Sequence, residues 1–200
     1  MKKFICLILA LTCAFSLFSC GDDGVDNIIE IVNSSKPDNI KTFTTYTSGN
    51  QTLTGSFNTD ISGSDYVTTY SYQRYADPLV DGGDAYIKEV EGTVYYSNGK
   101  YSEDGESWSI VAPDSNVINI KFSLSAKKLG KCVVSSDGKT LTATIAADKA
   151  YSILGVNLSA NDAGVTLKIT TNGTNLTYVT ISYVTVSEAS VVIQTSYTYQ

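Results

Sequence analysis

Strand-length segments separated by closely spaced turn residues are the feature that most constrains the fold of this 200-residue chain. From Leu53 to Phe57, every second residue lacks a polar side chain, and the residues between are threonine and serine. Alternation of this kind is typical of a strand that buries one face. The Asn98-Gly99 pair suits the type I′ turn of a β-hairpin. Strands are expected over 40–48, 51–60, 66–72, 90–96, 132–136, 139–146, 165–171, 176–186 and 191–199.

This spacing predicts a mainly β (α+β) fold with one antiparallel, meandering sheet. Two short helices are expected beside it. The first has an apolar stripe at helical spacing and ends before Pro37, and its acidic polar face favours packing on the sheet over lying on a membrane. The second runs from Asp148, a candidate N-cap, to a stop at Gly155. The stripe of the first helix consists of Val25, Ile28, Ile29 and Val32.

Residues 114–130 fit two structures. The regular alternation between Ile118 and Ala126 is typical of a strand. The spacing of Ile118, Phe122 and Leu129 also fits one stripe of a helix. Periodicity favours the strand, and the helix stays open as the alternative.

The N-terminus has the layout of a secretory signal, with a basic start and an apolar run before Ser19 and Cys20. It resembles the lipobox of bacterial lipoproteins, in which the cysteine thiol receives a diacylglycerol and becomes the mature N-terminus. Leu17 and Ser19 match that motif, whereas Phe18 is bulkier than usual. Two acyl chains suffice for stable anchoring. The resemblance implies a signal peptide over 1–19, a lipidated N-terminus and spacer over 20–24, and a single domain over 25–200.

The remaining residues offer little catalytic chemistry. The sequence has no histidine, the commonest general base and metal ligand. Cys132 is flanked by valines and is expected to be a small buried hydrophobic residue. Glu103, Asp104 and Glu106 surround a glycine turn and are expected to form a solvated loop rather than a glycosidase pair. We therefore expect no enzyme, no cofactor and no metal site. The excess of acidic residues, 20 against 14 basic ones, argues against a nucleic-acid partner.

The order of elements resembles that of the LolA, LppX and LprG lipoprotein carriers. The resemblance covers the lipobox, the amphipathic helix, the hairpin over 93–101 that leads to Trp108, and the short helix that ends at Leu154 and Gly155. It implies a half-barrel, that is, one curved antiparallel sheet with the N-terminal helix and one or two short helices on its concave side. An apolar cavity would lie between them and hold a lipid or acyl chain. In that family the segment after the tryptophan is often helical, and LolA itself has no lipid anchor.

Two functions follow from the sequence. The first is a lipid-anchored carrier in the bacterial cell envelope, on the extracytoplasmic side of a membrane, with an apolar ligand in the concave sheet. The alternative is a cell-surface module without a ligand cavity, which recognises a glycan or partner protein through exposed aromatic residues such as Tyr95, Tyr96, Tyr101 and Trp108. A cavity of roughly 300 Å³ or more with apolar walls would favour the carrier. The residues expected to line such a cavity are Phe57, Trp108, Ile118, Phe122, Leu129 and Leu154.

Overall fold

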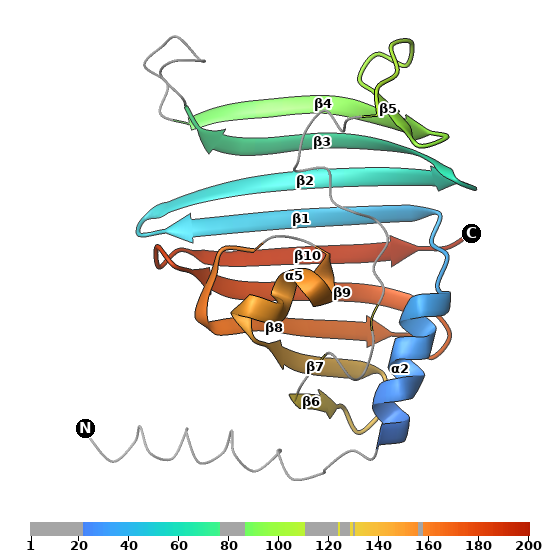
Figure 1. Cartoon of the computed structure of the whole chain (residues 1–200), viewed down its shortest axis with the longest axis vertical. Helices are drawn as coiled ribbons and strands as arrows, with labels where there is room; N and C mark the ends of the chain where they lie inside the picture. Colours follow the sequence, from blue (N-terminus) through green and yellow to red (C-terminus); the bar gives the residue numbers. More distant parts are fainter. Residues whose placement is uncertain (1–21, 77–86, 111–123, 125–128, 130, 156–157) are drawn as a thin grey trace.

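The structure, a computed structural model, describes residues 22–76, 87–110, 124, 129, 131–155 and 158–200. They form one curled, antiparallel sheet of ten strands with short helices beside it (Figure 1). The strands are β1 (Asn39–Ser48), β2 (Gln51–Ser62), β3 (Asp65–Tyr75), β4 (Ile87–Ser97), β5 (Lys100–Ser102), β6 (Lys131–Val134), β7 (Thr140–Ile145), β8 (Ala160–Thr171), β9 (Leu176–Thr185) and β10 (Ser190–Thr198). The helices are α2 (Asp22–Ser34), the 3₁₀ turn η1 (Ala147–Lys149) and α5 (Ala150–Leu154).

The sheet consists of two five-strand meanders that meet at the first and last strands. Its strand order is β5-β4-β3-β2-β1-β10-β9-β8-β7-β6. The predicted antiparallel meander is thus confirmed within each half. The pairing of β1 with β10, from Asn39 opposite Thr198 to Thr47 opposite Ser190, joins the halves.

The predicted strands are confirmed in the described part of the chain, and so is the tight hairpin turn between β4 and β5. Asn98 and Gly99 both have positive φ, 51° and 80°, as a type I′ turn requires. β8 begins at Ala160 rather than at the expected Val165. The added residues pair with β9 at Ala160, across a register shift between Ala160 and Val165. The strand-or-helix alternatives for 114–130 lie outside the described residues, except for Leu124 and Leu129.

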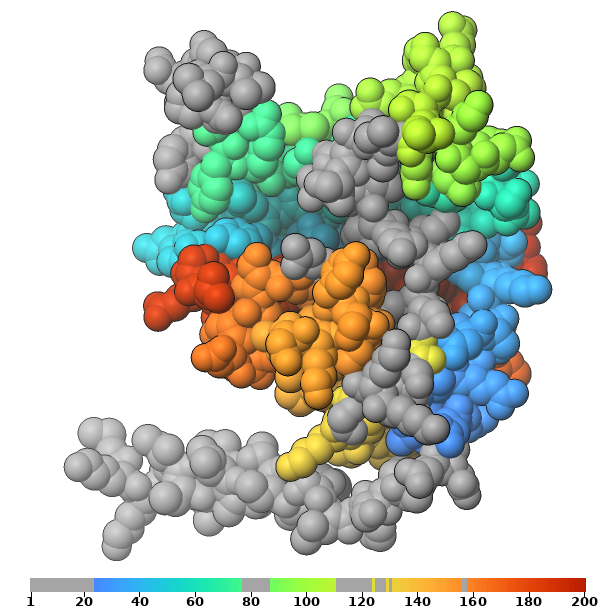
Figure 2. Space-filling model, in the orientation of Figure 1, coloured from blue at the N-terminus to red at the C-terminus, as the bar shows by residue number. Residues whose placement is uncertain are grey.

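The main core lies between one face of the sheet and the helices. Ile28 and Val32 of α2 are buried there, which confirms the predicted apolar stripe. Ile153 and Leu154 of α5 are buried in the same core. α2 packs chiefly on β6, β7 and β8, and Figure 2 shows α5 near the centre of this face. The strands contribute Leu141, Ile145, Leu167, Ile169, Val179 and Ile181.

Some details of the helices differ from expectation. α2 begins at Asp22, so most of the spacer expected over 20–24 is the first turn of the helix. Asp148 lies inside η1, and the residues that cap η1 and α5 make no side-chain capping hydrogen bond, so the predicted cap is wrong. Gly155 has a φ of 71° and ends α5 as predicted. No helix in the described residues is long and apolar enough to cross a membrane.

The C-terminal end of α2 is tied to the rest of the molecule by hydrogen bonds as well as by packing. The Asn33 side chain exchanges two bonds with the backbone of Leu124, from Nδ2 to the carbonyl oxygen at 2.9 Å and from the backbone N–H to Oδ1 at 3.0 Å. The backbone N–H of Leu176 in β9 donates to the Ser35 hydroxyl just after the helix, at 2.9 Å. The helix is therefore fixed in position on the sheet.

Gly164 lies at the register shift in β8, where β8 comes close to β7, and a substitution there tests this close approach. It has a φ of 80°, and a Cβ built there would collide with the carbonyl oxygen of Ile145. Gly164→Ala is expected to lower the free energy of unfolding by about 3 kcal/mol, of which about 1 comes from the backbone conformation and the rest from the collision. The loss is measured by urea unfolding followed by circular dichroism.

Gly99 provides the matched control, because it has the same φ and a Cβ there would meet no atom within 4 Å. Gly99→Ala should cost only about 1 kcal/mol. Equal losses in the two variants would contradict the close approach at Gly164.

Candidate binding surface

The face of the sheet opposite the helices is mostly polar. Residues directly paired across antiparallel strands point to the same side. Phe43 is paired with Ser56 in β2 and with Gln194 in β10, and their neighbours in the next row are likewise polar. Thr42 and Phe57 are paired with each other and point to the other side, toward the core. We call the side with Phe43 the polar face.

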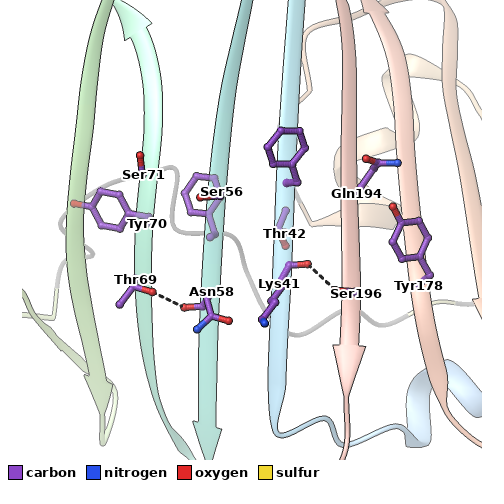
Figure 3. Close-up of a pocket in the computed structure, with 12 residues that line it drawn as sticks. Lys41, Thr42, Ser56, Asn58, Thr69, Tyr70, Ser71, Tyr178, Gln194 and Ser196 are labelled. Carbon is purple, nitrogen blue, oxygen red and sulfur yellow. Dashed lines mark hydrogen bonds between the residues drawn. The ribbon is translucent and has the colours of Figure 1, made fainter.

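A hollow of about 550 Å³ lies on the polar face and spans β3, β2, β1, β10 and β9 (Figure 3). It therefore crosses the junction between the two halves of the sheet. The described residues that line it all belong to strands, so a hydrogen-bonded framework sets this part of its shape. The side chains that face it include Lys41, Phe43, Ser56, Asn58, Tyr178 and Gln194.

Phe43 is the apolar centre of this hollow. Its side chain is 44% exposed although it lies in a central strand of the sheet. Around it stand an ammonium group on Lys41, a carboxamide on Gln194 and a phenol on Tyr178, together with serine hydroxyls. Figure 3 shows Gln194 and Tyr178 side by side on neighbouring strands. The surface thus combines an exposed apolar ring with several hydrogen-bonding groups.

Hydrogen bonds fix the orientation of polar side chains at one end of the hollow. Asn39 Nδ2 donates to Asn58 Oδ1 at 2.9 Å and to Asp60 Oδ1 at 2.6 Å. Asn58 Nδ2 in turn lies 3.4 Å from Asp60 Oδ2. A ligand would therefore meet an Asn58 carboxamide that is already held in place, which lowers the entropic cost of binding.

A smaller hollow of about 310 Å³ lies at the ends of β3 and β4, beside the loop after β5. Tyr95 and Val67 are paired across the two strands, and Trp108 completes the walls. Trp108 is 42% exposed. It precedes Ser109, which pairs with Tyr101 beyond the edge of β5.

Asp104 organises the loop that holds Trp108. Its Oδ1 accepts hydrogen bonds from the backbone N–H groups of Ser107 at 2.7 Å and Glu106 at 2.8 Å, and from the Ser102 hydroxyl at 2.8 Å. These bonds, the one from Ser107 first, hold the pKa of Asp104 far below its usual range. A depressed pKa favours this loop structure at neutral pH, and the contribution is lost only when the pH falls through that low value.

The helix-bearing face has its own aromatic group over β2 and β3. Phe57 stacks with Tyr70 and Tyr72, each at a ring-centroid distance of 6.3 Å. Tyr70 lies flat across Gly92 of β4, where a Cβ would come within 2.6 Å of the tyrosine hydroxyl. The missing side chain at Gly92 makes room for the ring.

Four of the predicted cavity residues are described by the structure, and they lie at three different places. Leu129 and Leu154 lie together in the main core, both buried. Phe57 lies on the helix-bearing face of β2, outside that core cluster, and Trp108 lies at the sheet edge. The other two predicted residues, Ile118 and Phe122, lie outside the described residues.

The aromatic residues singled out around the β4–β5 hairpin separate in a similar way. Tyr96 and Tyr101 are paired and pack at 5.0 Å between ring centroids. Tyr95 points to the opposite face, beside Trp108, because neighbouring strand residues alternate.

The sequence analysis did not identify Phe43 as a candidate binding residue. The alternation of side chains along the strand could have identified it. Ile40 points to the core, so Phe43, three residues later, points to the opposite face of the sheet.

No family model matches this chain, and a search of curated proteins found no match either. The geometry and chemistry of the two hollows are therefore the basis for assigning a function.

The Asp104 loop gives a testable prediction, because Trp108 is the one tryptophan of the sequence. Asp104→Ala removes the acceptor of three hydrogen bonds and should release the loop. The fluorescence anisotropy of Trp108 is expected to fall, while the far-ultraviolet circular dichroism of the sheet stays unchanged. Asp104→Asn keeps the Oδ1 acceptor and should stay close to the unmodified protein. An anisotropy that is equally low in both variants would contradict the role of Oδ1.

Proposed function

We propose that this chain is a lipid-anchored, extracytoplasmic binding protein that recognises a glycan on the polar face of its sheet. The observation that supports this function best is the hollow of about 550 Å³, with a half-exposed Phe43 inside a ring of polar side chains. A sugar ring has an apolar C–H face and an edge of hydroxyl groups. It could place the first on Phe43 and the second against Lys41 and Gln194.

The chemistry of the walls suits a neutral, hydroxyl-rich ligand. Lys41 offers three donors, and the carboxamides of Asn58 and Gln194 each offer both donors and acceptors. Hydroxyl groups of a ligand can pair with either kind, so neither partner is left unsatisfied. A purely apolar ligand would instead remove these polar groups from water without replacing their hydrogen bonds, which is unfavourable.

A carrier of an apolar ligand is the second candidate. The group of Phe57, Tyr70 and Tyr72 supports it, because these rings form an apolar surface on the helix-bearing face. The hollow of about 310 Å³ beside Trp108 also has the volume expected for a carrier, although Asp60 and Asp65 line it. Tyr70 and Tyr72 are half-buried rather than fully enclosed. Around Leu129 and Leu154, by contrast, the core is packed. The open polar hollow therefore favours the glycan function over the carrier.

Phe43 provides the test of the glycan site. Phe43→Ala is expected to weaken glycan binding about tenfold, because it removes the apolar contact, about 1 kcal/mol or slightly more for a half-exposed ring. The melting temperature should change little, since so much of the ring is already exposed. Glycan-array binding identifies the ligand, and isothermal titration calorimetry measures the loss.

Val133→Ala is the matched control, because Val133 is 56% exposed and lies on the same face in the edge strand β6. It should leave glycan binding unchanged. Equal effects of the two substitutions would exclude the hollow as the site. A stoichiometric lipid seen by native mass spectrometry, without any glycan response, would favour the carrier instead.

The anchor is tested at Cys20. We expect cells to incorporate an alkyne-labelled fatty acid into the chain and to retain the protein in the membrane fraction. Cys20→Ser should abolish both, whereas Cys132→Ser should affect neither, because Cys132 is a half-buried residue of β6. Labelling that persists in Cys20→Ser would contradict attachment at this position.

A further inference from the structure

We infer that the hollow beside Trp108 is a second binding site and that it takes a small organic cation, an alkylammonium group. This inference goes beyond the glycan function and does not depend on it. The site lies at the outer edge of the sheet, where the β2–β3 turn, β4 and the loop after β5 come together.

The walls of this site are aromatic. Tyr95 and Trp108 line a volume of about 310 Å³ together with Val67 of β3, which is paired with Tyr95. That volume lies at the lower end of the range for small-molecule pockets, which is enough for a small organic cation. The face of an aromatic ring attracts a cation, and among the ring systems of proteins the tryptophan ring does so most strongly.

The charge of the site selects the same class of ligand. Asp60 and Asp65 both line the hollow, and both are exposed. Asp60 is held by the hydrogen bond from Asn39 at 2.6 Å. An ammonium group would pair with these carboxylates while its alkyl part lies against Tyr95 and Trp108. A neutral apolar group would partly desolvate two carboxylates without compensation, and an anion would be repelled.

The position of Trp108 is set before any ligand arrives. Ser109 exchanges two backbone hydrogen bonds with Tyr101, at 2.7 and 2.8 Å, on one side of the tryptophan. The hydrogen bonds to Asp104 hold the loop on the other side. These bonds fix the backbone on both sides of Trp108, which lowers the entropic cost of ordering the loop when a ligand binds.

Lys100 is the charge that opposes the ligand. It is paired with Ser97, which lines the hollow, so the two side chains leave the sheet on the same side. Removing this charge should strengthen the binding of a cation, whereas removing an aspartate should weaken it. The two opposite effects distinguish a site from a general response to ionic strength.

Intrinsic fluorescence measures this binding directly, since Trp108 is the sole tryptophan of the chain. The full chain, purified in a non-ionic detergent, is titrated with tetramethylammonium chloride and, in parallel, with tert-butyl alcohol and with sodium chloride. We expect a saturable change of Trp108 emission with tetramethylammonium, at least tenfold weaker binding of the neutral alcohol, and no saturable change with sodium chloride. An equal response to the cation and the alcohol, or no response to the cation, would overturn the proposal.

Charge variants complete the test. Asp65→Asn should weaken tetramethylammonium binding about threefold to fivefold, as expected for an exposed ion pair. Lys100→Gln should strengthen it by a similar factor. Asp162→Asn, which removes one exposed negative charge in β8, is the matched control and should have no effect. If Asp162→Asn weakens binding as much as Asp65→Asn does, the attraction is that of the net charge and the site is refuted.

Discussion

The pairing of β1 with β10 is the constraint on which the rest of the structure depends. Within each half of the sheet, strands that are neighbours in sequence form hairpins, which are local and entropically inexpensive. The β1–β10 ladder instead joins residues such as Thr42 and Thr195, whose buried hydroxyls lie 3.1 Å apart although the residues are 153 positions apart in sequence. The larger hollow spans this junction, with Phe43 on one side and Gln194 on the other. It exists only when the two halves are joined.

In the proposed function, one side of the sheet holds the core and the other binds the ligand. The side that contacts α2 and α5 gathers the large apolar side chains and holds the core. The buried hydroxyls on that side pair with one another, as Thr59 does with Thr68 at 2.9 Å. The opposite side carries mostly polar side chains, so a ligand bound there would leave the core packing intact. Phe43 is an exception to this polarity, and the site is centred on it.

Much of the fold follows from local sequence signals. The alternation in 51–60 and the Asn98-Gly99 turn depend on a few neighbouring residues, so they could be predicted. The pairing of β1 with β10 depends on residues far apart, and no local pattern encodes it. The larger hollow was harder to predict from the sequence, because it forms from five strands whose register must be known first. Trp108 was recognised as a candidate, but its neighbours Asp60 and Asp65 come from another hairpin.

The early start of α2 sets how the molecule would stand on a membrane. With an acylated Cys20, Gly21 alone separates the lipid from a helix that is hydrogen-bonded to the rest of the molecule. The helix would then connect the lipid rigidly to the sheet, unlike a flexible linker. In Figure 1 the first turn of α2 lies at the β6 edge, and the β4–β5 edge is at the far end of the sheet. Nine strand spacings amount to about 40 Å. If Cys20 is acylated as proposed, Trp108 would therefore lie at the end of the sheet that is far from the anchor.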